Sequence, residues 1–188
     1  MPYIKLPEGV PGITGPMQAY PETAVYLRGL VNALLQGPSS LTPAEREIIA
    51  TSVSHGNECK FCTWSHAAIA RAHLGASANV VDDVLSGRAE TALSPKMNVL
   101  LTIAEKVRQD GRLVTADDVA KARAAGADDK AIHDTVLIAA AFCMFNRYVD
   151  GLGTWAPDEE SKYYASIGEM LAKDGYRYIP VEQLEGLR

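Results

Sequence analysis

The chain has 188 residues, of which 47% are hydrophobic and 22% are charged, as is typical of one compact domain with a buried core. Its 18 basic and 23 acidic residues give a net charge of -5, and no cluster of Lys and Arg stands out. This argues against a nucleic-acid-binding protein, which needs a basic patch, so we expect a small-molecule or protein partner.

The N-terminal segment is rich in proline and has no apolar stretch long enough for a signal peptide. The longest apolar run, residues 136–145, is too short to span a bilayer. We therefore expect a cytoplasmic protein with no membrane partner. In a reducing compartment, the three cysteines indicate catalytic or metal-binding thiols rather than a structural disulfide framework.

Helix signals follow one another along the chain, and almost nothing predicts a strand. Residues 1–20 are predicted to form an irregular arm, and residues 21–36 form an amphipathic helix. Thr42, Pro43 and Glu45 match a capping box with proline at the first helical position, which predicts a helix ending near His55. Caps and glycine stops predict further helices at residues 59–75, 77–85, 95–111, 115–126, 128–150 and 159–173.

These elements predict an all-α helical bundle that forms a single domain over residues 1–188. Within it, residues 1–20 form the arm, 21–155 the core, and 156–188 a C-terminal helix and a polar tail with Tyr176 and Tyr178. A weak internal sequence similarity at an offset of 51 residues aligns residues 75–77 with residues 126–128. It is expected either from a duplicated helical hairpin or from chance. In the second copy, Asp110 and Leu113 stand where the first has Cys59 and Cys62.

Cys59, Cys62 and His66 form a C-x-x-C-x-x-x-H motif at the start of a predicted helix. At 100° per residue their side chains fall within an arc of roughly 60°, on one helical face. Residues three apart in a helix have Cβ atoms about 5–6 Å apart, so the two cysteines can form a disulfide with little backbone movement. The positive end of the helix dipole favours a nucleophilic thiolate there. The motif therefore predicts thiol redox chemistry.

Two cues disagree about which sulfur attacks. The helix dipole favours Cys59, whereas His66 lies roughly 6 Å along the helix axis from Cys62 and roughly 10 Å from Cys59. We assign Cys62 as the attacking thiolate, Cys59 as the resolving thiol, and His66 as general base and acid. In the predicted cycle, Cys62 reduces a peroxide and becomes a sulfenic acid, Cys59 condenses with it, and an external dithiol reduces the disulfide without a metal or other cofactor.

The same segment resembles the alkylhydroperoxidase AhpD-like group of the carboxymuconolactone decarboxylase superfamily, where a Glu precedes the C-x-x-C-x-x-x-H motif by twelve residues. Here Glu47 stands twelve residues before Cys59. The resemblance implies that Glu47 and His66 form a proton relay, that Cys62 is peroxidatic and that Cys59 resolves. It covers roughly residues 20–155, and residues 145–153 look like the closing helix of the longer peroxidase-related members.

The resemblance also implies a wider set of properties. The family is all-helical and oligomeric, so we expect a dimer, trimer or hexamer; a role in antioxidant defence and reduction by a lipoyl-type dithiol are further expectations. Phe61 stands where some members carry a second His before the C-terminal cysteine, which removes one proton carrier. Phe61 and Trp64 are expected either to shape an apolar pocket for small organic hydroperoxides or simply to pack.

Three alternatives stay open. Cys59, Cys62 and His66 are three potential zinc ligands, with His55 or Glu47 as a fourth. A carboxymuconolactone decarboxylase-type lyase would need no disulfide cycle, and a redox-sensing partner protein would be oxidised without turnover.

Other reactive residues are assigned structural places. We expect Cys143 to be a buried inert thiol, His73 to pack or to lie at the rim, His55 to lie beside the site and His133 to be on the surface. Asn146, Arg147 and Asp150 are expected to cap their helix or to form an ion pair, with contact to a substrate as the alternative.

Overall fold

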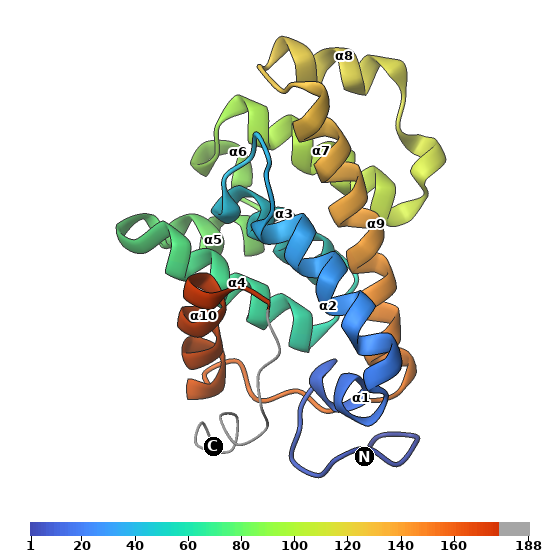
Figure 1. The fold of residues 1–188 in the computed structure, drawn as a ribbon. Coiled ribbons are helices and arrows are strands. Elements are labelled where there is room, and N and C mark those ends of the chain that lie inside the picture. Colours follow the sequence, from blue (N-terminus) through green and yellow to red (C-terminus); the bar gives the residue numbers. More distant parts are fainter. Residues whose placement is uncertain (177–188) are drawn as a thin grey trace.

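The computed structural model describes residues 1–176, so the predicted tail residue Tyr178 lies outside it. The prediction of an all-α fold is confirmed, because the described residues form helices and no strand (Figure 1). The α-helices are α1 Thr14–Ala19, α2 Pro21–Gln36, α3 Pro43–Gly56, α4 Lys60–Leu74, α5 Asn79–Leu85, α6 Ala89–Ala92, α7 Pro95–Gln109, α8 Ala116–Ala124, α9 Asp129–Gly151 and α10 Lys162–Asp174. Two 3-10 turns, η1 Gly75–Ser77 and η2 Gly111–Leu113, follow α4 and α7.

The predicted N-terminal caps are present. Thr42 accepts a hydrogen bond from the Glu45 N–H at 3.2 Å, and Glu45 accepts one from the Thr42 N–H at 2.8 Å, which completes the capping box of α3. Ser94 caps α7 through the N–H of Met97, and Asp128 caps α9 through the N–H of Ala131. Each cap supplies the acceptor that the first turn of a helix lacks, which is why these boundaries follow from sequence.

Some boundaries differ from those predicted. The irregular arm is a wrong prediction for residues 14–19, which form α1, because Gly15, Pro16 and Met17 are buried there against the rest of the fold. The last helix begins at Lys162 rather than at residue 159, since the side chain of Ser161 caps it. The short α6 and the turn η2 have no strong sequence signal and were not predicted.

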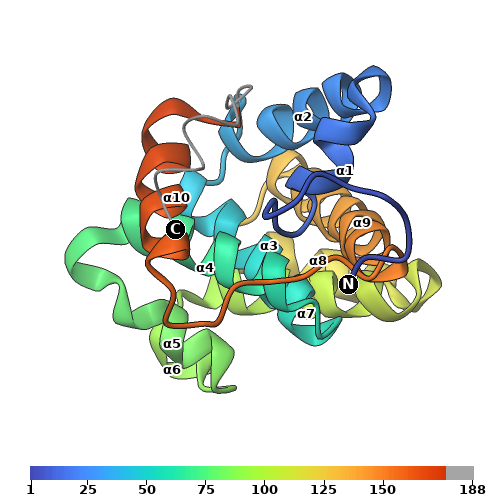
Figure 2. The same ribbon diagram turned by 90° about the horizontal axis from the view of Figure 1, so that it is seen from below.

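Helix α3 runs through the middle of the bundle. It packs against α2, α4, α5, α7 and α9, and the main core contains buried apolar side chains from all of these helices. A second, smaller apolar cluster lies between α4 and α10 and includes Cys59, Phe61, Cys62, Val149 and Ile167. In Figure 2 the N-terminal arm and α1 lie on the same side of the molecule as the end of α9. Because this smaller cluster also contains Val149 of α9 and Ile167 of α10, the two cysteines lie where α4, α9 and α10 meet.

Helix α10 approaches α4 closely at Gly168. A Cβ on Gly168 would lie 2.9 Å from both the backbone carbonyl carbon and the oxygen of Ala68, so no side chain fits without movement of a helix. Gly168→Ala should therefore destabilise the fold by about 1–3 kcal/mol, despite the higher helix propensity of alanine.

Gly29 of α2 is the matched control, because nothing lies within 4 Å of a Cβ placed there. Gly29→Ala should stabilise the protein by about 0.5–1 kcal/mol. Thermal denaturation of both variants measures the difference. Equal shifts in the same direction would show that α10 does not pack on α4 at this position.

The helices that follow Gly75 and Gly126, the two glycines aligned by the internal sequence similarity, differ in length. Gly75 and Gly126 both have positive φ, +55° and +92°, and each lies at the end of a helix. Gly75 leads through a 3-10 turn to the seven-residue α5, whereas Gly126 leads to the 23-residue α9. The duplicated hairpin stays a prediction.

None of the described helices combines the length and the hydropathy needed to cross a bilayer. The cytoplasmic location and the homo-oligomer stay predictions.

Candidate active site

The two motif cysteines lie side by side as free thiols, both fully or almost fully buried. Cys59 is the N-cap of α4, with extended backbone angles, and Cys62 is in the first turn. A hydrogen bond joins the two side chains. Cys62 and His66 therefore lie on one face of α4, as predicted. Cys59 precedes the first helical residue and contacts Cys62 from the N-cap position.

A strained turn places Cys59. Glu58 has φ +58°, the only positive φ of a non-glycine residue among residues 1–176, and it follows the C-cap Asn57 of α3. The N–H of Cys59 then donates to the carbonyl of Ser54 at 3.1 Å. This short turn makes α3 and α4 an antiparallel pair, which brings the middle of α3 against α4.

Glu47 and His66 meet across that pair of helices. Glu47 is fully buried, and its Oε2 lies 2.8 Å from His66 Nδ1. The hydroxyl of Tyr176, just beyond α10, donates to Glu47 Oε1 at 2.5 Å and lies 3.2 Å from His66 Nδ1. As an acceptor, the carboxylate favours the imidazole tautomer with the proton on Nδ1, which leaves Nε2 as the basic nitrogen.

Tyr176 was not singled out for the site from the sequence. Its N–H donates to Asn32 Oδ1 at 3.1 Å, and this contact with α2 fixes the chain after α10 over His66. Burial, followed by the charge of Glu47, raises the pKa of Tyr176 well above its usual value, so the phenol stays protonated. A tyrosine after a helix stop carries no local signal that it reaches a site more than a hundred residues away.

The last turns of α9 supply two further contacts to the sulfurs. Asn146 is buried and forms hydrogen bonds with Cys62 and, through Nδ2, with Ser54 Oγ at 3.1 Å. Asp150, one turn later, forms a hydrogen bond with Cys59 and is itself exposed to solvent. Asn146 and Asp150 therefore contact the thiols, which was not predicted, and the carbonyl of Asp150 also accepts the hydrogen bond of the C-cap N–H of α9, in agreement with the expected cap. Their i, i+4 spacing in an otherwise apolar helix was the available signal.

The environment holds Cys62 as a thiol in the resting site. Its hydrogen bond with Cys59, and then its burial, raise the pKa of Cys62 well above its usual value, while the Asn146 hydrogen bond acts in the opposite direction. Burial raises the pKa of Asp150, and the hydrogen bond from Cys59 lowers it. No hydrogen bond joins His66 to Cys62 within the described chain. A proton must therefore leave Cys62 before its sulfur becomes a strong nucleophile.

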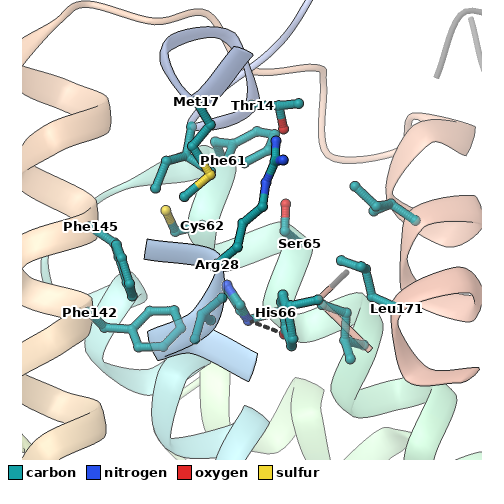
Figure 3. Close-up of a pocket in the computed structure, with 15 residues that line it drawn as sticks. Thr14, Met17, Arg28, Phe61, Cys62, Ser65, His66, Phe142, Phe145 and Leu171 are labelled. Atoms are coloured by element: carbon teal, nitrogen blue, oxygen red, sulfur yellow. Dashed lines mark hydrogen bonds between the residues drawn. The ribbon is translucent and has the colours of Figure 1, made fainter. Parts of the chain in front are cut away.

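Cys62 and His66 both line a cavity of about 110 Å³ (Figure 3). Its other walls are mostly apolar and come from α1, α2, α4, α9 and α10, with Val31, Ile69, Phe142 and Ile167 among them. Phe61 also lines the cavity, whereas Trp64 lines a different groove beside Arg71. Of the two aromatic residues predicted for the pocket, only Phe61 is there.

Phe61 is held by the N-terminal arm. Gly12 has φ +54°, and a Cβ on it would lie 2.1 Å from the Phe61 ring, so the arm packs directly on that ring. On its other sides, the ring packs near Tyr163 and Tyr164 of α10. Phe61, which stands where some family members carry a second histidine, therefore packs in the cavity wall beside Cys62.

The remaining candidate residues lie apart from this site. His55 and His133 are exposed, His73 is half-buried, and Cys143 is half-buried beside Asn57 rather than fully buried as predicted. Arg147 is exposed and donates to the carbonyl of Cys143 at 2.9 Å. No group of three or more His, Cys, Asp or Glu side chains among residues 1–176 is placed to hold a metal ion.

The fold is that of AhpD-type proteins. The crystal structure of an alkylhydroperoxidase AhpD core, an uncharacterized peroxidase-related protein from Ralstonia eutropha JMP134, has a TM-score of 0.74 and 26% identity, covering 85% of this chain and 81% of that one. An uncharacterized peroxidase-related protein from Silicibacter sp. TM1040 has a TM-score of 0.71 and 24% identity, covering 87% and 80%. A protein of unknown function from Agrobacterium tumefaciens, named as a candidate antioxidant-defence protein AhpD, has a TM-score of 0.65 and 22% identity, covering 75% and 94%.

Residues 21–106 match the model of the carboxymuconolactone decarboxylase family. The predicted resemblance to the AhpD-like group of this superfamily is therefore confirmed. No curated protein matches the chain. The matched segment contains Glu47, Cys59, Cys62 and His66, whereas the contacts from α9 and Tyr176 lie outside it.

Proposed function

We propose that the protein is a thiol peroxidase of antioxidant defence that reduces small organic hydroperoxides through a Cys59–Cys62 dithiol. One observation carries the proposal: Cys62 and His66 line the same apolar cavity, and each is backed by its own buried partner, Cys59 and Glu47. A thiol and a basic imidazole on one cavity wall are the two groups that peroxide reduction requires.

In the first step, a hydroperoxide in the cavity lies between Cys62 and His66. His66 Nε2 takes the thiol proton, and the sulfur attacks the terminal peroxide oxygen, which breaks the O–O bond. The alkoxide that leaves takes the proton from His66. Cys62 becomes a sulfenic acid and is oxidised by two electrons, while the hydroperoxide is reduced to an alcohol.

In the second step, the Cys59 sulfur attacks the sulfenic sulfur, and water leaves as the disulfide forms. Asp150 accepts the proton of Cys59, since it bonds to that buried thiol, and releases it to solvent, to which it is open; the hydroxide that leaves Cys62 takes up a proton from solvent and departs as water. An external dithiol of the lipoyl type then reduces the disulfide by thiol exchange and is oxidised in turn. Glu47 and Tyr176 hold the His66 tautomer throughout.

The raised pKa of Cys62 predicts a distinctive pH dependence. Because the raised pKa keeps the thiolate fraction of Cys62 small at neutral pH, and this fraction grows about tenfold per pH unit below the pKa, oxidation of His66→Ala should accelerate by that factor for each unit of pH. The native protein should depend less steeply on pH, since His66 removes the proton during attack. Stopped-flow oxidation by tert-butyl hydroperoxide measures both profiles, and parallel profiles would show that His66 takes no proton from Cys62.

Steady-state reduction of tert-butyl hydroperoxide by dihydrolipoamide tests the proposal as a whole. Repeated turnover is expected in a buffer that contains a metal chelator. Oxidation of the dithiol once per chain, with no further turnover, would favour a redox-sensing partner protein instead.

The lyase alternative is kept because of the name of the matched family. Decarboxylation of a carboxymuconolactone by a variant that lacks both Cys59 and Cys62 would support it over the peroxidase.

A further inference from the structure

The cavity wall contains a buried hydroxyl group whose hydrogen no described residue accepts. Ser65 of α4 lines the cavity and is only 5% exposed, and its Oγ has no hydrogen-bond partner among residues 1–176. The hydroxyl of Tyr176, on the same cavity wall, donates instead to Glu47. A buried hydroxyl without a partner costs folding free energy, so such a group in a protein normally has a role. Because Ser65 faces the cavity, a molecule bound there is the available acceptor.

Ser65 shares one face of α4 with the two reacting groups. At 100° per residue, Ser65 lies about 60° to one side of Cys62 around the helix axis, and His66 lies about 40° to the other side. Residues three or four apart in a helix have Cβ atoms about 5–6 Å apart, so both are neighbours of Cys62. All three line the cavity (Figure 3). A hydroperoxide whose terminal oxygen contacts the Cys62 sulfur therefore has the hydroxyl on one side and the imidazole on the other.

The leaving oxygen of the peroxide needs a hydrogen-bond donor. As the O–O bond breaks, negative charge develops on the oxygen that is attached to carbon, and the mostly apolar walls of the cavity stabilise such a charge poorly. Before the attack, His66 Nε2 is the unprotonated nitrogen, so it has no hydrogen to donate to this oxygen. A hydroxyl already held in the wall stabilises the charge without reorganisation.

We propose, on the basis of the proposed peroxidase activity, that Ser65 is a further catalytic residue, which donates a hydrogen bond to the leaving oxygen of the hydroperoxide. The bond strengthens during the attack by Cys62, because its acceptor changes from a neutral oxygen to an alkoxide. The alkoxide then takes the proton that His66 received from the thiol, and Ser65 keeps its own proton. The products are still a sulfenic acid and an alcohol, so the electron balance of the step is unchanged.

Two peroxides with different leaving groups test this role. tert-Butyl hydroperoxide releases an alkoxide, which is a strong base, whereas peracetic acid releases acetate, which delocalises its own charge. Ser65→Ala should slow the oxidation of Cys62 by tert-butyl hydroperoxide about 10- to 100-fold, the effect expected of a hydrogen bond to a developing charge. It should slow oxidation by peracetic acid less than about threefold, since little charge needs a donor there. Stopped-flow mixing of the reduced protein with each peroxide measures both rates.

The same comparison distinguishes a catalytic hydroxyl from a structural one. If Ser65 only packed beside Cys62, its replacement would misplace the sulfur and slow both peroxides by the same factor, and equal factors would overturn the inference. The melting temperature of Ser65→Ala should rise, because an unpartnered buried hydroxyl is removed. A lower melting temperature would show that the hydroxyl has a partner within the folded chain, which also contradicts the inference.

Ser86→Ala is the matched control. Ser86 is exposed at the end of α5, far from the cavity lining, and its hydroxyl donates to the carbonyl of Asp82 at 2.7 Å. This variant should be oxidised by both peroxides at the native rates.

Binding of the product alcohol gives a readout that needs no turnover. An NMR titration of the reduced protein with tert-butanol should show an affinity about 2- to 10-fold weaker in Ser65→Ala than in the native protein, the effect of one neutral hydrogen bond. Equal affinities would show that the hydroxyl does not reach the oxygen of a bound molecule, and the inference would fail.

The outcomes also separate this inference from the peroxidase proposal. If tert-butyl hydroperoxide oxidised the native protein and Ser65→Ala equally fast, the role of Ser65 would be disproved and the peroxidase proposal would stand. If neither peroxide oxidised the native protein, both would be wrong. A selective loss with tert-butyl hydroperoxide, together with weaker binding of tert-butanol, is the result that we expect.

Discussion

Cys62→Ser is expected to abolish peroxide turnover, whereas Cys59→Ser is expected to stop after one oxidation and to accumulate a sulfenic acid on Cys62. The two variants differ because the cavity is lined by Cys62 but not by Cys59, so only Cys62 is presented to a peroxide. Serine cannot form the sulfenic acid at position 62, and at position 59 it cannot resolve one. Mass spectrometry of each variant after peroxide treatment, with and without a sulfenic-acid trap, measures the outcome.

Cys143→Ser is the matched control, because Cys143 is the third free thiol and contacts Asn57 and Arg108 instead of the pair. It should keep native turnover. If Cys59→Ser lost peroxide reactivity while Cys62→Ser kept it, the roles of the two sulfurs would be reversed. The position of Cys59 as the N-cap of α4, at the positive end of the helix dipole, would be the physical reason for such a reversal.

His66→Ala is expected to slow sulfenic acid formation by roughly 10²–10⁴-fold at neutral pH, the usual contribution of a positioned general base. The loss should be large because Cys62 holds its proton in the resting site, where burial and the hydrogen bond with Cys59 raise its pKa. Rapid mixing with tert-butyl hydroperoxide, followed by quenching and thiol labelling, measures this single step without the later reduction by dithiol.

Glu47→Gln tests the carboxylate behind the imidazole. Glutamine keeps the shape of the side chain, but its amide can donate to His66 Nδ1 and so favour the tautomer with the proton on Nε2. We therefore expect the rate of sulfenic acid formation to fall by a large part of the loss seen in His66→Ala. Lys121→Gln, at an exposed ion pair of α8, is a charge control that should have no effect. A native rate in Glu47→Gln would show that the buried carboxylate is structural.

Much of the fold follows from the sequence because its signals are local. Thr42 with Glu45, Ser94 and Asp128 satisfy the first N–H groups of their helices by contacts within three residues, so their caps are visible without the tertiary structure. The short helix α1 has no such cap, and its burial against other elements decides its structure. The pairing of Glu47 with His66 was expected only from the family resemblance, and the α3–α4 hairpin places it.

The rest of the site depends on long-range packing. Tyr176 reaches Glu47 from 129 positions away, and Asn146 reaches Ser54 from 92 positions away, distances at which no periodic pattern applies. The fold therefore adds to the predicted motif a shell of contacts that sets the protonation of the thiols and the polarity of the cavity.

The central claim is that one peroxide molecule oxidises one neighbouring pair of thiols. Peptide mapping and free-thiol counting of the native protein, before and after one equivalent of tert-butyl hydroperoxide, test it most directly. We expect three free thiols before treatment and a Cys59–Cys62 disulfide afterwards, with Cys143 still reduced. Three free thiols after treatment, or a disulfide that includes Cys143, would contradict it.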